Sequence, residues 1–369
     1  MPTPAPHESD MRREIEEIPG VVERLLVDGA GETTVIAAAV RTRAPRWVSI
    51  VARGTSDHAG IYARYLLETH LRLPVSLAAP AVTTVYGGGP EWRDALVIAV
   101  SQSGQSPDVV GVAEAARDGG AMTIAVTNDR TSPLAGVTDF VLPCDAGVEQ
   151  SVAATKTYVA QLAALASLVA RLAPQTELAG AIGALPDALA ACLRAAQSWL
   201  DVGGGDATQP ATVFARADRV LVASRGYNLA TALEVALKLK ETSRIFAEGY
   251  STADLLHGPV ILSAQDVPAL VFRPDGRMGL SIDTAVARLR ATGSDPWIIG
   301  GAELGRGGAD SSTSAQDAKR RLSLPLALPE ALTPLAFVLP GQLLAEAVAR
   351  RRGYALDAPE GLAKVTRTL

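Results

Sequence analysis

The sequence predicts an α/β protein made of two similar, doubly wound domains, each built on a parallel sheet. Its 369 residues are long for one core and natural for two domains. Short apolar runs alternate with helical stretches, which is the pattern of βαβ units. The chain also repeats itself, because residues 47–68 and residues 219–241 share one pattern of apolar strand, Arg-Gly turn and helix.

The repeat predicts equivalent strands in the two halves. Once Arg53-Gly54 is aligned with Arg225-Gly226, three later strands also find partners. The predicted pairs are Ala95–Val100 with Pro268–Phe272, Thr123–Val126 with Trp297–Gly300, and Phe140–Pro143 with Leu322–Pro325. In sheets of this kind ligands bind at the carboxyl ends of the strands, so the loops that follow them are the places to search for a site.

The order of elements divides the chain into four predicted segments. A helical N-terminal segment, with a helix at Met11–Leu26, precedes two domains, and a polar tail follows them. A glycine-rich stretch, Asp201–Pro210, is the predicted linker between the domains. The predicted bounds are 1–34 for the N-terminal segment, 35–196 and 205–345 for the domains, and 346–369 for the tail.

Composition argues against several classes of partner. A formal charge of −5 offers no basic surface for nucleic acid. The most apolar long run, Val152–Ala173, contains charged residues, and the first residues lack the apolar core of a signal peptide. Two cysteines, Cys144 and Cys192, suggest no disulfide framework. We therefore expect a cytoplasmic protein that binds neither nucleic acid nor membrane.

The scarcity of lysine points to carbonyl or amine chemistry. The chain has five lysines against 29 arginines. Unlike arginine, lysine can lose its proton when buried and can form a Schiff base with a carbonyl. Chance retention in an arginine-rich composition is the alternative explanation for any one of them.

A serine-rich loop follows the predicted strand Ala95–Val100. Ser106 and Pro107 are typical of a helix start, and Gly104 would let a ligand approach the backbone closely. The hydroxyls of Ser101 and Ser103 add donors beside the positive end of that helix, which suits a phosphate group. An ordinary capped turn is the alternative interpretation.

The helix predicted at 228–241 is apolar on nearly all sides except for Glu234, Lys238 and Glu241. Their spacing of i, i+4 and i+7 places them on one narrow face of a largely buried helix. Buried charges must pair or take part in chemistry, so a structural Glu–Lys bridge and a catalytic role remain open. A base role is favoured for Glu241, because it lies at the helix end.

Histidines are few and scattered. His257 closes a short helix beside a glycine, with Ser251 and Asp254 as a predicted capping pair, and plain helix capping would explain it. No two histidines have metal-ligand spacing, so the sequence predicts no metal site.

Six short motifs occur in one order and resemble the sugar isomerase (SIS) superfamily, specifically the isomerase half of glucosamine-6-phosphate synthase. The resemblance implies two flavodoxin-like SIS domains. The motifs are Gly54–Gly60, Ser101–Gly104, Ala153–Lys156, Ala236–Glu241, His257–Pro259 and Gly361–Thr366.

The resemblance also implies roles for individual residues. Glu241 matches the base that moves a proton between C1 and C2 of the sugar, and His257 matches the ring-opening histidine, which reaches the site from the neighbouring subunit. Lys364 matches the lysine that engages the sugar carbonyl, while Lys238 and Glu234 flank the base. The matching substrate-binding positions are Gly54, Thr55, Ser56, Ser101, Gln102, Ser103, Ser106, Ala153, Ala154, Lys156 and Glu234.

Departures from the synthase pattern narrow the expected activity. The chain runs almost directly from Met-Pro-Thr into the isomerase segment, so we expect no glutaminase activity. It also has Gln105 where the synthase has glutamate and Ala154 where the synthase has serine. The motifs are closer to type II glucosamine-6-phosphate deaminases, which are built on the SIS fold.

The resemblance therefore implies conversion of glucosamine 6-phosphate and water to fructose 6-phosphate and ammonia. No cofactor is expected, because the proton moves within the substrate, and a homodimer with shared active sites is implied. Two alternatives remain. One is a deglycase or isomerase of another amino-sugar phosphate, such as fructosamine 6-phosphate or galactosamine 6-phosphate. The other is a non-catalytic sugar-phosphate sensor, because SIS domains also serve in transcriptional regulators.

Overall fold

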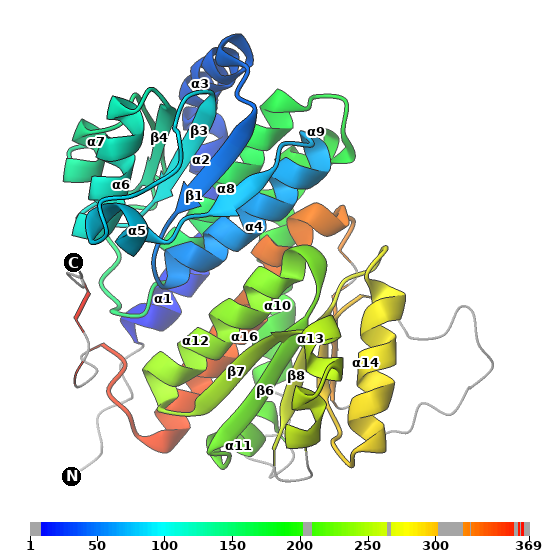
Figure 1. Ribbon diagram of the computed structural model, residues 1–369. Helices are drawn as coiled ribbons and strands as arrows, with labels where there is room; N and C mark the ends of the chain where they lie inside the picture. Colours follow the sequence, from blue (N-terminus) through cyan, green and yellow to red (C-terminus); the bar gives the residue numbers. More distant parts are fainter. Residues whose placement is uncertain are drawn as a thin grey trace. The chain divides into compact units, whose positions relative to one another are not determined.

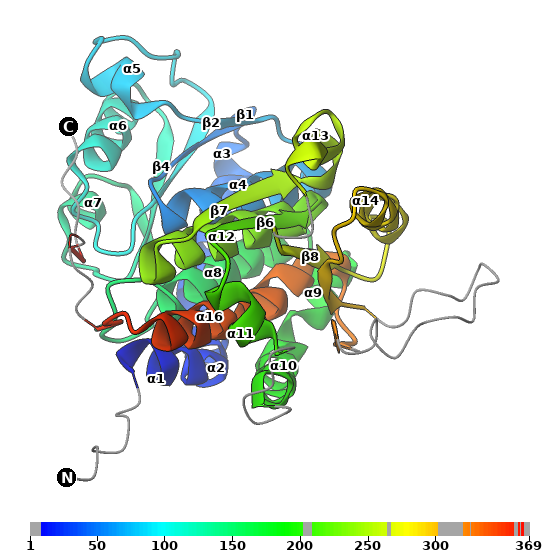
Figure 2. The same ribbon diagram turned by 90° about the horizontal axis from the view of Figure 1, so that it is seen from below.

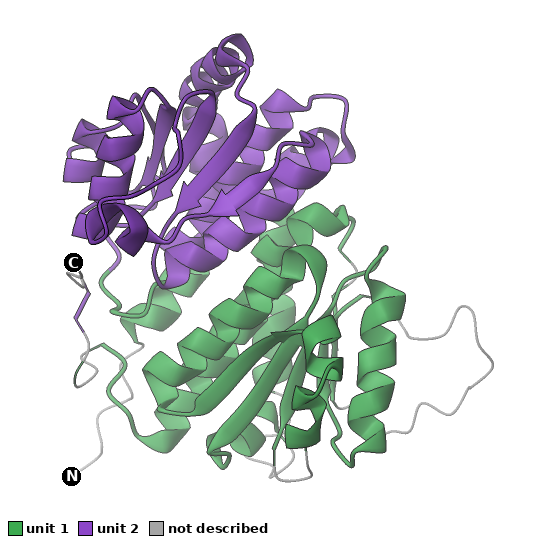
Figure 3. Cartoon of the chain, in the orientation of Figure 1, with its two compact units in different colours: residues 1–17, 150–155, 187–362 green, residues 18–149, 156–186, 363–369 purple. Residues whose placement is uncertain are grey.

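The chain folds into two compact units, shown green (unit 1) and purple (unit 2) in Figure 3. Unit 1 comprises residues 1–17, 150–155 and 187–362, and unit 2 comprises residues 18–149, 156–186 and 363–369. The computed structural model describes residues 9–201, 209–263, 267–301, 320–324, 326–357, 361 and 363–364. Each unit is built around one parallel sheet, which confirms the predicted α/β class with two similar halves.

The sheet of unit 2 has five parallel strands in the order β2-β1-β3-β4-β5. The central strands β3 and β4 are buried along their whole length, as expected for a sheet covered on both faces. The strands are β1 (Trp47–Val51), β2 (Val75–Leu77), β3 (Ala95–Val100), β4 (Met122–Thr127) and β5 (Phe140–Pro143).

Helices cover both faces of this sheet (Figures 1 and 2). On one face α4 (Thr55–His70) packs against α8 (Lys156–Leu172), and α2 (Ile18–Asp28) and α3 (Ala30–Arg43) pack on α8. The elements of the other face are α5 (Pro80–Thr84), α6 (Pro107–Asp118) and α7 (Pro133–Gly136), and α9 (Glu177–Ala181) and η1 (Ile182–Ala184) follow α8.

The predicted N-terminal helix Met11–Leu26 is broken into two helices. α1 (Asp10–Glu16) ends just before α2 begins at Ile18. Pro19 explains the break, because proline has no N–H to donate to the preceding turn.

The sheet of unit 1 repeats the topology of unit 2. Its order is β10-β9-β8-β6-β7, and all its strands are parallel. When the strands of each unit are numbered along the chain, both sheets have the order second, first, third, fourth, fifth. The strands are β6 (Arg219–Ser224), β7 (Phe246–Ser251), β8 (Ala269–Arg273), β9 (Trp297–Gly300) and β10 (Arg321–Ser323). The residue at the end of the last predicted strand, Pro325, lies outside the described residues.

The edge strands β2 and β7 are not among the strands that the sequence predicts. β2 has only three residues. The sequence of β7 is not a continuous apolar run, because Glu248 and Gly249 interrupt it. Gly249 has a packing role, because a Cβ there would lie 2.9 Å from the Cα of Leu233 on helix α12 (Leu229–Ser243). Glycine thus allows β7 to approach the helix.

Helices also flank both faces of the unit 1 sheet (Figure 1). α12 (Leu229–Ser243) packs against α16 (Thr333–Arg352), which continues seven residues beyond the predicted domain end at 345. The remaining elements are α10 (Leu185–Asp201), α11 (Pro210–Ala215), η2 (Gly226–Asn228), α13 (Thr252–Leu256), η3 (Pro259–Leu262), α14 (Gly279–Ala291) and η4 (Glu330–Leu332).

Two helical stretches of the described chain, Glu177–Asp201 and Glu330–Arg352, are long and apolar enough to span a membrane by length and composition alone. The apolar part of the second is 94% buried, as in the core helix of a globular unit. The first contains α10, whose Leu185, Leu189 and Cys192 are buried on one side. These two helices are therefore weak evidence for a membrane.

Candidate active site

The serine-rich loop of unit 2 connects the buried strand β3 to α6, as the sequence predicts. Ser106 occupies the N-cap position and Pro107 the first helical position, but the Ser106 side chain makes no capping hydrogen bond. Gly104 has φ +60°, and a Cβ there would lie 2.1 Å from Ser132 Oγ. Only glycine fits at this point, so the loop shape depends on that residue.

Hydrogen bonds to and within the serine-rich loop fix its conformation. The N–H of Gly104 donates to Ser101 Oγ over 3.2 Å, and the N–H of Gln105 donates to Ser103 Oγ over 3.3 Å. Thr127 Oγ1 donates to the carbonyl of Gln102 over 3.2 Å. A hydroxyl that accepts a hydrogen bond keeps its own proton to donate, so Ser101 and Ser103 can both donate to a phosphate oxygen. The N-terminal end of the 12-residue helix α6 adds a positive dipole end.

The turn after β1 lies beside this loop, because β1 and β3 are parallel neighbours. Arg53 makes an ion pair of 2.7 Å with the buried carboxylate of Asp108, which links the turn to the start of α6. Gly54 has φ +55°, and Thr55 begins α4. Ser56 is buried and accepts a hydrogen bond of 2.9 Å from Gln161 on α8. This hydrogen bond therefore connects α4 to α8.

The N-terminal end of α8 carries a second cluster. Lys156, the first residue of α8, is 3% exposed. The N–H of Thr157 donates to Glu149 over 3.1 Å, and the other oxygen of Glu149 lies 2.8 Å from Lys364 Nζ. Glu149 thus caps α8 and binds the lysine of the C-terminal segment. The sequence does not single out Glu149, because no local pattern distinguishes a carboxylate whose partner is 215 residues away.

Residues Ala153 and Ala154 belong to unit 1, in the segment 150–155. The buried carboxylate of Glu14 accepts hydrogen bonds from the backbone N–H groups of Gln150 and Ser151. At the other end of the segment, Gln342 of α16 donates to the carbonyl of Thr155 over 3.3 Å. Contacts with α1 and α16 therefore fix the backbone on both sides of Ala153 and Ala154.

The charged face of α12 is buried, as its sequence predicts. Lys238 Nζ lies 3.3 Å from Glu234 and 2.5 Å from Glu241. Burial by itself lowers the pKa of Lys238, but the charges of the two glutamates and hydrogen bonds to both outweigh it and raise this pKa above its ordinary value. Lys238 therefore stays protonated and acts as a fixed cation. The Glu241 side chain is 27% exposed, so its carboxylate is held by Lys238 and still open to another molecule.

His257 ends α13, where its backbone N–H donates to the carbonyl of Asp254 over 3.1 Å. Ser251 stands at the N-cap of α13, but its side chain makes no capping hydrogen bond, so the predicted capping pair is not formed. The imidazole of His257 is exposed and has no hydrogen-bond partner in the described part of the chain. It is therefore available to a substrate or to another subunit.

The predicted site residues fall into two groups, one in each unit. Across the described ranges no three His, Cys, Asp or Glu side chains are grouped as metal ligands would be. Cys144 and Cys192 are buried free thiols, and burial raises the pKa of each. Unit 2 holds Gly54, Thr55, Ser56, Ser101, Gln102, Ser103, Ser106, Lys156 and Lys364, and unit 1 holds Ala153, Ala154, Glu234, Lys238, Glu241 and His257.

The fold and these loops define a family. The SIS domain profile matches residues 44–171 and 213–305, more than half of the chain. The chain therefore belongs to the SIS domain family.

Particular relatives can then be named. The chain is 35% identical over 326 residues to the isomerizing glutamine–fructose-6-phosphate aminotransferase of Zymomonas mobilis, an alignment that covers 86% of this chain and 51% of that protein. The chain spans about half the length of such curated relatives.

Solved structures agree with the fold. A candidate phosphosugar isomerase from Silicibacter pomeroyi is 36% identical, with a TM-score of 0.81 and coverage of 94% of this chain and 99% of that one. Glucosamine-6-phosphate deaminase from Thermotoga maritima has a TM-score of 0.73 with 98% and 100% coverage, but only 19% identity. That second likeness shows the fold alone.

Proposed function

We propose that the protein is an amino-sugar-phosphate deaminase, which converts glucosamine 6-phosphate and water to fructose 6-phosphate and ammonia. The observation that carries this proposal is the 2.5 Å contact between Lys238 and Glu241. A carboxylate that is oriented by a buried cation and remains 27% exposed suits a base that must meet a substrate. A sensor would need the anion-binding loop but not this base.

The proposed reaction moves one proton within the substrate before water enters. Ser101, Ser103 and the N-terminal end of α6 bind the phosphate. His257 shuttles a proton between the ring oxygen and the C1 hydroxyl, which opens the ring. Glu241 takes the proton from C2 to form an enolamine and returns it at C1. The resulting C2 imine is hydrolysed by water, which leaves a ketone at C2 and releases ammonia.

Lys364 is proposed to polarise the substrate carbonyl and, as part of a terminal flap, to exclude water until hydrolysis. Glu149 supports this role as a positioning residue, because its buried carboxylate contacts both Lys364 and the backbone N–H of Thr157 on α8. A lysine held in one place needs no further ordering when substrate binds.

His257 is proposed to serve the site of a neighbouring subunit in a homodimer. Its exposed imidazole supports this assignment. The test is subunit mixing, in which inactive His257→Ala and Glu241→Ala chains should regain some activity as heterodimers. No recovery after confirmed subunit exchange would contradict a shared site.

The central test is release of ammonia and fructose 6-phosphate from glucosamine 6-phosphate by purified protein, with Glu241→Gln as the inactive control. Equal release of both products, abolished in the control, is the expected result. Release of fructose 6-phosphate from fructosamine 6-phosphate, without release from glucosamine 6-phosphate, would indicate the deglycase activity instead. Binding of the sugar phosphate without turnover of any of these substrates would contradict the enzyme and favour the sensor.

A further inference from the structure

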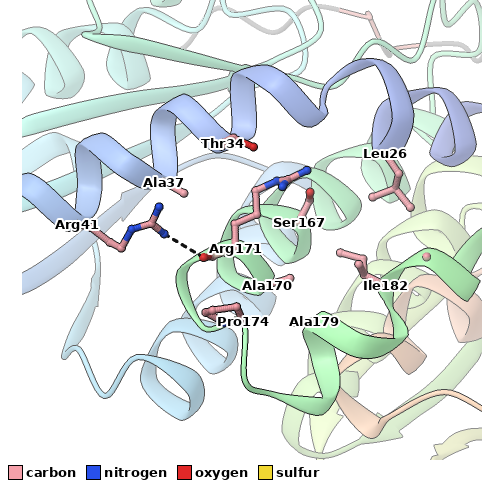
Figure 4. Close-up of a pocket in the computed structure, with 11 residues that line it drawn as sticks. Leu26, Thr34, Ala37, Arg41, Ser167, Ala170, Arg171, Pro174, Ala179 and Ile182 are labelled. Atoms are coloured by element: carbon pink, nitrogen blue, oxygen red, sulfur yellow. Dashed lines mark hydrogen bonds between the residues drawn. The ribbon is translucent and has the colours of Figure 1, made fainter.

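Unit 2 contains a second candidate site, far along α8 from the residues described above. A cavity of about 520 Å³ lies where α3, the C-terminal end of α8 and the segment that begins with Pro174 meet (Figure 4). Lys156 and Arg171 are 15 residues apart on α8, which corresponds to ~22 Å along the helix. The cavity is therefore separate from the serine-rich loop and from the Glu149–Lys364 pair.

Two arginines give this cavity its charge. Eleven residues line it, among them Arg41 and Arg171, and none is an aspartate or a glutamate. Arg41 donates to the backbone carbonyl of Arg171 over 3.0 Å, so one of its nitrogens is used at the end of α8. The cavity walls thus carry positive charge with no acidic side chain to balance it.

Arg171 has a buried Nε with no hydrogen-bond acceptor among the described residues. No ion pair joins this side chain to any residue in the described ranges. Figure 4 shows the side chain extending from α8 toward Thr34 of α3, close to Ser167. The Arg171 residue is half-buried, but its Nε is not reached by solvent. A buried N–H without an acceptor is costly, so such groups generally have a partner in the functional state.

The remaining walls suit a small organic molecule. Leu26 and Ile182 contribute apolar surface, while Thr34 and Ser167 contribute hydroxyls. The volume falls within the ~300–1,000 Å³ typical of small-molecule sites, which combine apolar walls with a few polar groups.

We propose that this cavity binds a small anionic metabolite, whose carboxylate or phosphate group pairs with the guanidinium of Arg171 while Arg41 closes the site from α3. Arginine offers planar, paired donors that match either oxyanion. The bound anion would contact the C-terminal end of α8. The N-terminal end of the same helix carries Lys156 and Thr157 of the candidate active site.

Hydrogen–deuterium exchange with inorganic phosphate and with citrate as separate probes tests the proposal, because exchange reports each region of the chain independently. At least one probe should slow exchange in peptides from 34–41 and 167–183. In Arg171→Gln and in Arg41→Gln the binding that produces this protection should weaken about tenfold or more. Any phosphate protection at 101–106 should be unchanged in both variants.

Arg43→Gln is the matched control, because Arg43 also lies on α3 and donates to a backbone carbonyl, that of Gly120, but does not line the cavity. It should leave protection at 167–183 intact. Ligand-free Arg171→Met should melt no lower than the wild type, because an apolar group replaces an unpaired donor. Absence of protection at 167–183 with either probe, or a clear fall in the melting temperature of Arg171→Met, would overturn the proposal.

Discussion

Lys364 Nζ lies 2.8 Å from a carboxylate oxygen of Glu149, and the Glu149 side chain is fully buried. The same carboxylate accepts the backbone N–H of Thr157 at the start of α8. One side chain therefore connects the C-terminal segment of the chain to a helix start in unit 2. The position of Lys364 depends on a residue that belongs to none of the recognised motifs.

Replacing Glu149 by glutamine should impair activity far more than stability. The amide oxygen of the new side chain can still accept the hydrogen bond from the N–H of Thr157, and the Lys364 side chain is 26% exposed, so water can solvate its ammonium. The free energy of unfolding should therefore fall by only about 1–2 kcal/mol. Misplacement of Lys364 should lower kcat for glucosamine 6-phosphate by about tenfold or more. Steady-state kinetics and urea unfolding measure the two effects.

Glu32→Gln is the control, because Glu32 makes an exposed ion pair with Arg130 in the same unit and should leave kcat unchanged. In a Lys364→Met background, Glu149→Gln should have no additional effect on kcat. An additive loss in the double variant would show that Glu149 does not act through Lys364.

Removing the buried cation of α12 should strongly destabilise the protein. Lys238→Met removes the ammonium that pairs with Glu234, whose side chain is 0% exposed. Breaking a buried pair in this way costs about 3–5 kcal/mol, measured as the loss in unfolding free energy. Lys240→Met on the same helix is the control, because Lys240 is 44% exposed and should change stability by less than about 0.5 kcal/mol. Equal losses from the two variants would be inconsistent with a buried network.

The stability supplied by Lys238 should be lost as pH rises in the alkaline range. Its pKa is raised in the folded protein, because the two glutamates outweigh the effect of burial. The contribution is therefore fully present below the ordinary value of 10.5 and is lost as pH rises through the higher folded pKa. The difference in unfolding free energy between the wild type and Lys238→Met should stay constant from neutral pH to about 10 and shrink above it. A difference that shrinks already between pH 7 and 9 would contradict the raised pKa.

Gly104 should be intolerant of any side chain. Its φ of +60° and the 2.1 Å separation between an added Cβ and Ser132 Oγ mean that Gly104→Ala must distort the loop. We expect a loss of about 2 kcal/mol or more in unfolding free energy and loss of protection of 101–106 by sugar phosphate. Gly120→Ala, which also has a positive φ but meets no atom within 4 Å, should cost only about 1 kcal/mol. Similar losses in both variants would exclude the contact with Ser132 as the cause.

Local sequence patterns are sufficient to predict much of the fold. Strands such as Phe140–Pro143 and Trp297–Gly300 have the bounds that the sequence predicts, because buried parallel strands are continuous apolar runs. The edge strands β2 and β7 escape prediction, since the partner strand and not their own composition makes them part of a sheet. The break at Pro19 has a local cause but also escapes prediction, because the apolar pattern continues across it.

The candidate site divides in the same way. The serine-rich loop and the charged face of α12 can be predicted because their residues lie within one turn or one helix, where spacing sets proximity. The hydrogen bond between Gln161 and Ser56 and the linking of Arg53 to Asp108 cannot be predicted, because each joins residues from different elements.

By itself, the sequence determined the α/β class, the internal repeat, the glycine that shapes the serine-rich loop and the burial of Lys238 between two glutamates. Only the tertiary structure decided that Glu149 binds Lys364, and that the buried Nε of Arg171 has no acceptor in the described part of the chain. The physical reason is that periodicity and turn chemistry act over a few neighbouring residues. The partner of a buried charge is instead chosen by the chain topology, which brings together groups as far apart as 215 residues.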